Sequence, residues 1–344
     1  MNPTDFSKSL TDFLSKYLPG ERGMSTNTIN SYKVSFILFI NFIETEKNIS
    51  VTKLSLKNIT KECVVEFLDW LQVKRHCSDS TRNVRLAAIH SFFNFLQYDV
   101  PENMNEWQRI LSIKVKKAKK HSMNYLTLEG IRLLLAQPNL STKKGRRDLA
   151  MLALMYDCAA RVQEIIDLTP ASLRLTKPFT IKLVGKGNKA RIVPLMDKEV
   201  THLKYYMEKN HLLQPHANLY PLFYNSRKEK LTRAGVHFIL QHYANKAREK
   251  DPKLIPDKMS PHSLRHSKAM HLLQAGVNLV YIRDILGHES VQTTEVYARI
   301  DSKQKREAIE KAYADIVKRE EPSWTNNNDL LEWLKNFQRS ENIM

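Results

Sequence analysis

The chain of 344 residues is long enough for two domains, and its hydrophobic share of 42% allows each of them a buried core. A formal net charge of +18 attracts polyanions, so nucleic acid is the first candidate partner. Three scattered cysteines without metal-site spacing, no signal-peptide core and no long apolar run argue against disulfides, zinc, secretion and a membrane span, and favour the cytoplasm.

Residues 1–111 are predicted to form a small helical domain, in line with a low glycine count of 9 in the whole chain. One helix begins at Thr26 or Asn27, a second covers residues 61–74, and a third begins at Ser80. Apolar residues at helical spacing mark the buried sides of the first and third helices: Ile29, Phe36, Ile40 and Ile43, then Val84, Ala88, Phe92 and Phe95.

Basic residues follow in two places. Arg82 and Arg85 lie near the start of the third helix, where they either reach phosphates or only face solvent. Residues 112–121 contain a run that repels itself and stays extended unless a polyanion neutralises it: Lys114, Lys116, Lys117, Lys119 and Lys120. We interpret this run as a basic linker to a second domain, residues 122–320.

The second domain is predicted to open with a helix capped by Thr127. The basic stretch 143–147 is expected to be a loop, and the apolar residues after it indicate a helix over residues 148–157. Two β-like runs, 179–184 and 190–195, flank the sequence Gly-Lys-Gly-Asn-Lys, which is typical of a hairpin turn. The fold class is therefore mainly α with a small β-hairpin.

The most informative stretch is 260–300. Ser260 is a good N-cap, and Pro261 fits the first helical position, where its missing N–H costs nothing. This start places His262 in the first turn, with Arg265 three residues later on the same face.

Gly276 is expected to end that helix, and the next one runs from a cap at Asn278 to Gly287. His288 follows this second helix end directly, and Tyr297 comes nine residues later. Two imidazoles, a guanidinium and a phenol are therefore expected within one compact set of helices.

Three pieces of this stretch resemble, in order and spacing, the motifs of the tyrosine recombinases, or lambda-integrase family: His262-Ser263-Leu264-Arg265, Leu286-Gly287-His288 and Tyr297. The flanking segments look closest to the Xer-like branch. Residues 158–165 resemble the family's first arginine motif, with Arg161 and Glu164 matching and Ala159 in place of the usual glycine. A salt bridge between Arg161 and Glu164 within one helix turn is the structural alternative.

The resemblance implies a two-domain fold, with an N-terminal core-binding (SAM-like) domain and a mostly helical catalytic domain. It implies a site-specific recombinase or integrase that cuts and rejoins double-stranded DNA through a 3′-phosphotyrosyl intermediate and a Holliday junction. Integration, transposition or resolution would be its task. No metal or other cofactor is expected, and the protein is expected to be a monomer in solution and a homotetramer in the synaptic complex.

The implied catalytic residues are Arg161, Lys186, His262, Arg265, His288 and Tyr297. Tyr297 is the nucleophile, the two arginines hold the phosphate through paired hydrogen bonds, and His288 donates another. Lys186 protonates the leaving 5′-oxygen, with Lys189 as its rival on the same turn, and His262 assists proton removal from the tyrosine. Of the other tyrosines, Tyr281 resembles a core residue, and Tyr313 lies in a charged helix.

Two other functions remain open: a type IB topoisomerase, which shares the chemistry but relaxes DNA as a monomer, and an inactive DNA-binding regulator. The tail, residues 321–344, is predicted to contain a short helix with Leu330, Trp333, Leu334 and Phe337 on one side. Its apolar face needs a partner, either its own domain or a neighbouring subunit.

Overall fold

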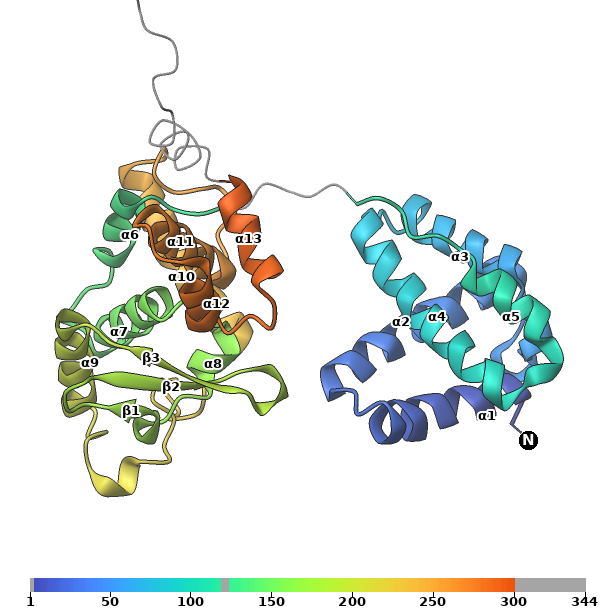
Figure 1. Ribbon diagram of the computed structural model, residues 1–344, viewed down its shortest axis with the longest axis horizontal. Helices are drawn as coiled ribbons and strands as arrows, with labels where there is room; N and C mark the ends of the chain where they lie inside the picture. The colour runs from blue at the N-terminus through green and yellow to red at the C-terminus, as the bar shows by residue number, and fades with distance from the viewer. Residues whose placement is uncertain (1–2, 119–123, 301–344) are drawn as a thin grey trace, which may run out of the picture. The chain divides into compact units, whose positions relative to one another are not determined.

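The computed structural model describes residues 3–118 and 124–300, and the chain divides into two compact units between Ser122 and Met123 (Figure 1). The expected tail helix, Tyr313, Lys119 and Lys120 lie outside the described residues.

The first unit is helical throughout. Its helices are α1 (Asp5–Asp12), continued by a π-helical stretch (Phe13–Glu21), α2 (Thr26–Lys47), α3 (Lys61–Val73), α4 (Asp79–Asp99) and α5 (Met104–Leu111). Short 3₁₀ turns lie at Val51–Lys53, Leu56–Asn58 and Pro101–Asn103. The three helices predicted from the sequence are confirmed, although the side chain of Ser25 caps α2 where Thr26 or Asn27 was expected.

Aromatic rings fill the core of this unit. Phe92 of α4 meets Phe13 and Phe36 edge to face, with ring centroids 5.3 and 5.2 Å apart. The prediction that Val84 is buried is wrong, since its side chain is 46% exposed. The buried stripe of α4 runs instead through Leu86, and two residues correspond to about 200° around a helix.

The second unit contains the remaining helices: α6 (Leu128–Leu135), α7 (Lys143–Asp157), α8 (Val162–Ile166), α9 (Asp197–Lys209), α10 (Arg233–Lys250), α11 (Pro261–Gln274), α12 (Leu279–Leu286) and α13 (Val291–Ile300). The predicted cap at Thr127 is confirmed. The basic stretch 143–147 is not a loop, because the side chain of Thr142 accepts from the Gly145 N–H and starts α7 five residues earlier than expected.

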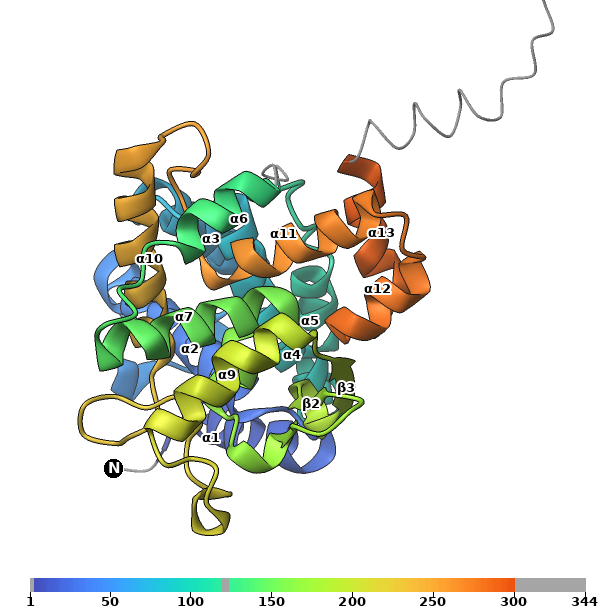
Figure 2. The ribbon, with the colours of Figure 1, turned by 90° about the vertical axis from the view of Figure 1, so that its left-hand side faces the viewer.

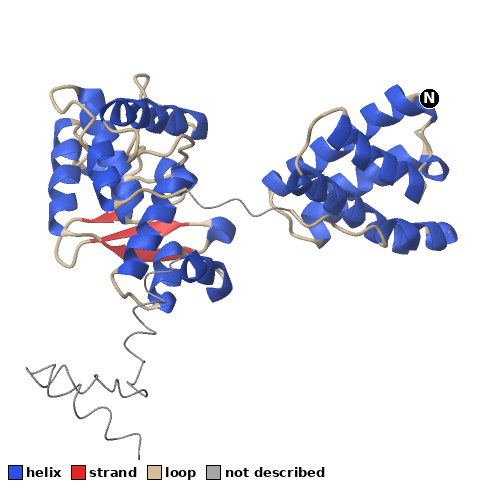
Figure 3. Ribbon diagram, turned by 90° about the horizontal axis from the view of Figure 1, so that it is seen from above, coloured by secondary structure: helices blue, strands red, loops and turns tan. Residues whose placement is uncertain are grey.

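A small antiparallel sheet of β1 (Leu173–Arg174), β2 (Thr180–Val184) and β3 (Ala190–Pro194) completes this unit (Figure 3). The predicted hairpin is confirmed, with Leu183 opposite Arg191 in the register. Because side chains alternate along a strand, Arg191 shares the inner face of β3 with buried Val193. That face carries Arg191 toward α8 and α12.

The sheet lies at one end of the second unit, and α6, α11 and α13 lie at the other (Figures 1 and 2). Helix α7 packs on α9 and α11, and α12 contacts α11, α13 and β3. Of the helices that the structure describes, none is both long and apolar enough to span a membrane. Residues 3–118 and 124–300 contain no group of three or more His, Cys, Asp or Glu side chains placed to hold a metal ion.

Candidate active site

Arg161 lies at a sharp junction between α7 and α8. Beyond the end of α7, Ala159 adopts the left-handed conformation, with φ of +47°, for which glycine is usually preferred. The N–H groups of Ala159 and Ala160 donate hydrogen bonds to carbonyls of α7. Arg161 is then the extended N-cap residue of α8, so its side chain leaves a turn and not the face of a helix. Alanine thus adopts the turn at which the family motif usually has glycine.

Arg265 of α11 is almost fully buried, with 4% of its surface exposed. Its Nη1 donates to the Ala159 carbonyl at 2.6 Å, and its Nη2 donates to the Leu286 carbonyl. Burial and the nearby charges of Arg161 and Arg191 lower the pKa of Arg265 from 12.5 to about 10, so the group stays charged at neutral pH. Its contacts with carbonyls fix the guanidinium plane and leave its positive charge for an anion.

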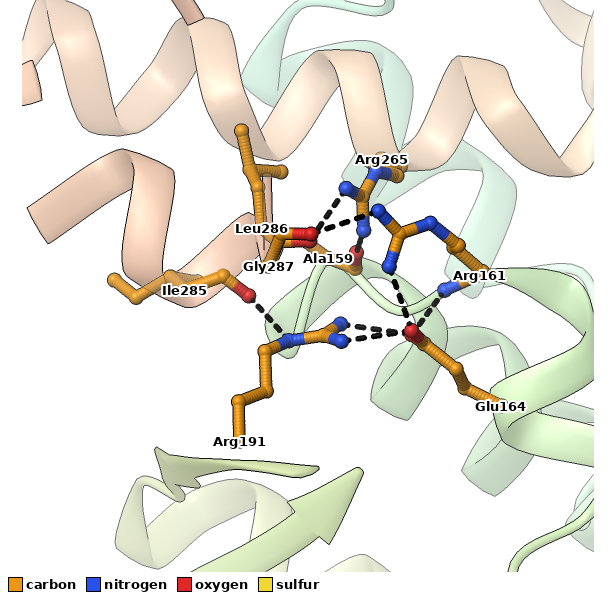
Figure 4. Close-up of polar contacts among 8 residues, drawn as sticks. All are labelled: Ala159, Arg161, Glu164, Arg191, Arg265, Ile285, Leu286 and Gly287. Atoms are coloured by element: carbon orange, nitrogen blue, oxygen red, sulfur yellow. Dashed lines mark hydrogen bonds and ion pairs between the residues drawn. The ribbon is translucent and has the colours of Figure 1, made fainter. Parts of the chain in front are cut away.

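Three guanidinium groups meet at the C-terminus of α12 (Figure 4). Carbonyls of a last helical turn lack partners within the helix and carry the negative end of the helix dipole. These consecutive carbonyls hold the cations together against their mutual repulsion. Ile285 accepts from Arg191 at 2.8 Å, Leu286 accepts from Arg265, and Gly287 accepts from Arg161 at 2.9 Å.

Buried Glu164 is the counter-charge of two of these arginines. Arg191 donates to both of its carboxylate oxygens at 2.7 Å, and Arg161 donates to it from Nη1 at 2.8 Å and from its backbone N–H at 2.7 Å. Burial alone would raise the pKa of Glu164, but the hydrogen bonds and charge of Arg191 and the hydrogen bonds of Arg161 lower it below its ordinary value. The salt bridge considered from the sequence is therefore present, together with an arginine that the sequence did not reveal.

His262 and His288 lie close to these cations. Burial, followed by the charges of Arg265 and Arg161, lowers the pKa of both imidazoles, that of His288 to about 4. The His288 Nδ1 lies 2.9 Å from the hydroxyl of buried Thr294. An open cleft of about 500 Å³ is bordered by Arg161, Arg191 and His288 together with the turn of the β2–β3 hairpin. The cleft is the place where an anion would meet the guanidinium groups.

Tyr297 is buried, with only 2% of its surface exposed, and packs among apolar side chains of α11 and α12. Its hydroxyl lies 2.9 Å from Nδ1 of His266. Burial and the neighbouring His262 and Arg265 lower the pKa of His266 to about 4, so this imidazole is neutral. In the tautomer with its proton on Nε2, its Nδ1 accepts the phenolic hydrogen. Burial also raises the pKa of Tyr297, which keeps the phenol protonated.

The sequence did not reveal the role of His266. Its only signal was its place one residue after Arg265 on a helix that already carried candidate residues. Tyr281, which resembled a core residue, is 67% exposed on α12, so that prediction is wrong. Its apolar neighbours suggested burial, but consecutive residues of a helix point in different directions.

Of the two lysines in the hairpin turn, Lys189 has a described side chain and Lys186 does not. Lys189 Nζ lies 2.9 Å from Glu289 Oε1, and both side chains are exposed. Lys186 belongs to the short turn Lys186–Asn188, but its side chain lies outside the described residues. Their assignment as proton donors therefore stays a prediction.

The candidate DNA-binding residues fall into two groups. Arg82 is buried, and within the described part of the chain neither its Nε nor its Nη1 has a hydrogen-bond partner, while Arg85 donates to Ser31 and Ser35. In the linker, Lys114, Lys116 and Lys117 are exposed, and Lys116 also donates to Gln72 of α3. The exposed lysines are free to meet a phosphate, and Arg82 is not accessible in this structure.

The lowered histidine pKa values predict that acid destabilises the second unit. An ordinary histidine has a pKa of 6.5, whereas His266 and His288 titrate near 4 in the folded protein. Between these two pH values the unfolded chain binds more protons than the folded protein does. The free energy of unfolding therefore decreases as the pH falls from 7 toward 4. The melting temperature should decrease over this range, and less steeply in His266→Gln. His202→Gln, at an exposed position of α9, is the control and should keep the wild-type slope.

Comparison with known proteins gives the same picture for both units. Residues 124–304 match the phage integrase family, and residues 10–98 match the phage integrase N-terminal SAM-like domain. The tyrosine recombinase XerC of Herpetosiphon aurantiacus is 33% identical over 86% of this chain and 91% of its own length. The tyrosine recombinase XerD of Listeria innocua is 30% identical over 85% of this chain and 93% of its own.

Solved structures of recombinases have a similar fold. The XerH site-specific recombinase in its pre-cleavage complex with difH substrate has a TM-score of 0.65, 26% identity, and covers 86% of this chain and 82% of its own. A lambda integrase dimer bound to a core site has a TM-score of 0.63 at 14% identity, which is a likeness of fold. The expected fold class and N-terminal domain type are confirmed. The chain belongs to the phage integrase family of tyrosine recombinases.

Proposed function

We propose that this protein is a site-specific recombinase that breaks and rejoins DNA strands with Tyr297 as the nucleophile. The phenolic oxygen attacks phosphorus and forms a 3′-phosphotyrosyl bond, while the bond to the 5′-oxygen breaks and leaves a 5′-hydroxyl. The reverse attack rejoins the strand without ATP because the phosphodiester is conserved. Arg161 and Arg265 bind the non-bridging oxygens, His288 donates a further hydrogen bond, and Lys186 protonates the leaving oxygen.

The observation that carries this proposal is that Arg161 and His288 border one cleft, while Arg265 is bound to the carbonyl next to the one that holds Arg161. Tyr297 lies on helix α13, which contacts both α11 and α12. A phosphodiester in attack accumulates negative charge, and preorganised guanidinium groups stabilise that charge in a partly desolvated site. The test is covalent capture of the protein on a suicide substrate, a duplex with a nick beside the cleaved bond, read on a denaturing gel.

The buried Tyr297 must leave its pocket to reach a phosphate in the cleft. In the DNA-free protein, the hydroxyl of Tyr297 is hydrogen-bonded to His266. His262 lies on the same helix, and its ring centroid is 6.2 Å from that of His266. Burial and then the charges of Arg265 and Arg161 lower the pKa of His262, which supports a position near the proposed phosphate site. His262 is therefore the imidazole that we propose to assist proton removal during attack, with His266 holding the resting nucleophile.

We further propose that the DNA-bound state is a homotetramer on two duplexes that exchanges strands through a Holliday junction. Binding to duplex DNA is supported by XerH, a site-specific recombinase of similar fold that is bound to its substrate. The mass of the complex formed on paired target duplexes, measured by light scattering, distinguishes four protomers from the single protomer of a topoisomerase. An inactive regulator would form no covalent adduct.

The linker lysines should contribute to DNA affinity without selecting sequence. Replacing Lys114, Lys116, Lys117, Lys119 and Lys120 by Gln should weaken binding to target and random DNA alike, because phosphates carry no sequence information. Each phosphate contact that is lost should flatten the slope of log K against log salt by about 0.9. A smaller variant replaces only the exposed Lys114 and Lys117 by Gln. Its control replaces two exposed lysines of the first unit, Lys8 and Lys16, by Gln. An unchanged slope in the linker variant would identify the run as a solvated spacer.

A further inference from the structure

Arg191 lies beside the proposed phosphate-binding arginines and is bound to the same buried carboxylate as Arg161. It is held at three points: Nε donates to the Ile285 carbonyl, and both terminal nitrogens donate to Glu164. It comes from the inner face of β3, far in the sequence from both partners. Gly287 leaves it room, since a Cβ there would lie 3.0 Å from Arg191 Nη1.

We infer that Arg191 is a positioning residue that neutralises Glu164 and thereby leaves the charge of Arg161 available to the scissile phosphate. This inference rests on the proposed function and assigns Arg191 no contact with substrate. Two guanidinium groups and one carboxylate carry a net charge of +1. Without Arg191, Arg161 and Glu164 would form a closed, neutral pair.

The geometry indicates which arginine is compensated. Arg191 meets both oxygens of Glu164 as a two-pronged fork, the strongest arrangement of this ion pair, while the Arg161 side chain meets only Oε1 (Figure 4). The Arg191 and Glu164 side chains are 10% and 2% exposed, whereas that of Arg161 is 32% exposed. The uncompensated charge therefore lies at Arg161, which is the more exposed of the two cleft-lining arginines bound to Glu164. The buried pair of Arg191 and Glu164 is screened least by salt.

The test is a cycle of four proteins: wild type, Arg191→Gln, Glu164→Gln and the double variant. Single-turnover cleavage of the suicide substrate at saturating DNA should fall about tenfold in Arg191→Gln, within the coupling range of one hydrogen-bonded network. Glu164→Gln added to it should restore the rate to that of Glu164→Gln alone, because no carboxylate remains to neutralise Arg161. Arg283→Gln removes a cation that lines the same cleft but pairs with Asp284, and should cleave like wild type.

A second measurement separates charge from structure. A methylphosphonate at the cleaved linkage is neutral and needs less cationic stabilisation. The difference in cleavage rate between wild type and Arg191→Gln should therefore be smaller on this substrate. A merely structural defect would persist on this substrate. If Arg191→Gln does not fold because buried Glu164 loses its two-pronged partner, the double variant should still fold and cleave.

Three results would overturn the inference. The first is a double variant that does not fold or that cleaves no faster than Arg191→Gln. The second is a rate difference between wild type and Arg191→Gln that is unchanged on the neutral substrate, and the third is slower cleavage by Glu164→Gln than by Arg191→Gln. Absence of any adduct with the wild-type protein is a different outcome, because it would refute the proposed function itself.

Discussion

Tyr297→Phe should abolish covalent capture of DNA and leave DNA binding close to wild type. The substitution removes the one oxygen that can attack phosphorus, while the affinity of such proteins comes mainly from phosphate contacts spread over the interface. Removing the hydroxyl also ends its hydrogen bond to His266, which should cost only about 1 kcal/mol of folding stability. The measurement is a suicide-substrate reaction on a denaturing gel beside a gel shift of the same sample.

Tyr281→Phe is the matched control for this experiment. It makes the same chemical change at an exposed tyrosine of the neighbouring helix α12, and its adduct yield should equal that of wild type. A protein–DNA adduct that persists in Tyr297→Phe would show that another residue is the nucleophile. Loss of binding in that variant would instead indicate that the phenol supports the fold of the interface.

Arg161→Lys and Arg265→Lys should each slow cleavage on the order of 10²-fold or more. Lysine keeps the charge but cannot reproduce a planar fork, and each of these arginines already uses part of its fork to hold its own position. Arg265 donates to two carbonyls, so an ammonium group there would satisfy one and leave the other buried without a donor.

The two arginines should also differ from each other. Arg265 is nearly buried and is tied to α7 and α12 through Ala159 and Leu286, so Arg265→Lys should lower the melting temperature as well as the rate. Arg161 is more exposed, and its substitution should affect mainly the rate. Arg283→Lys, a surface arginine of α12 beside the same cleft, is the control. Cleavage within a few-fold of wild type in either active-site variant would contradict the proposed paired hydrogen bonds to phosphate.

Local interactions explain why much of the fold could be predicted. Thr127 caps α6 through its own side chain, and Gly287, with φ of +61°, ends α12 in the left-handed conformation, so both limits are set within a few residues. The hairpin of β2 and β3 follows from alternating apolar residues around a glycine-rich turn. The start of α7 was misjudged because basic residues resemble a loop, although Thr142 is a strong cap.

Packing between distant segments explains the errors and omissions. The Val84 and Tyr281 predictions failed because the exposure of a helical side chain depends on which face the neighbouring helices cover. His266 and Arg191 were omitted because neither belongs to a recognisable motif. Their roles depend on contacts with Tyr297 on α13 and with Glu164 on α8, which the chain brings together only after folding.

The sequence by itself determined the family, the two units and the order of the motif residues, because these depend on residue identity, spacing and local caps. Only the tertiary structure decided that three arginines share the carbonyls that end α12, that Glu164 lies between two of them, and that Tyr297 rests against His266. The reason is physical: hydrogen bonds and charges act over a few ångströms in space, and these groups come within that range only when α7, α8, α11, α12, α13 and β3 pack together.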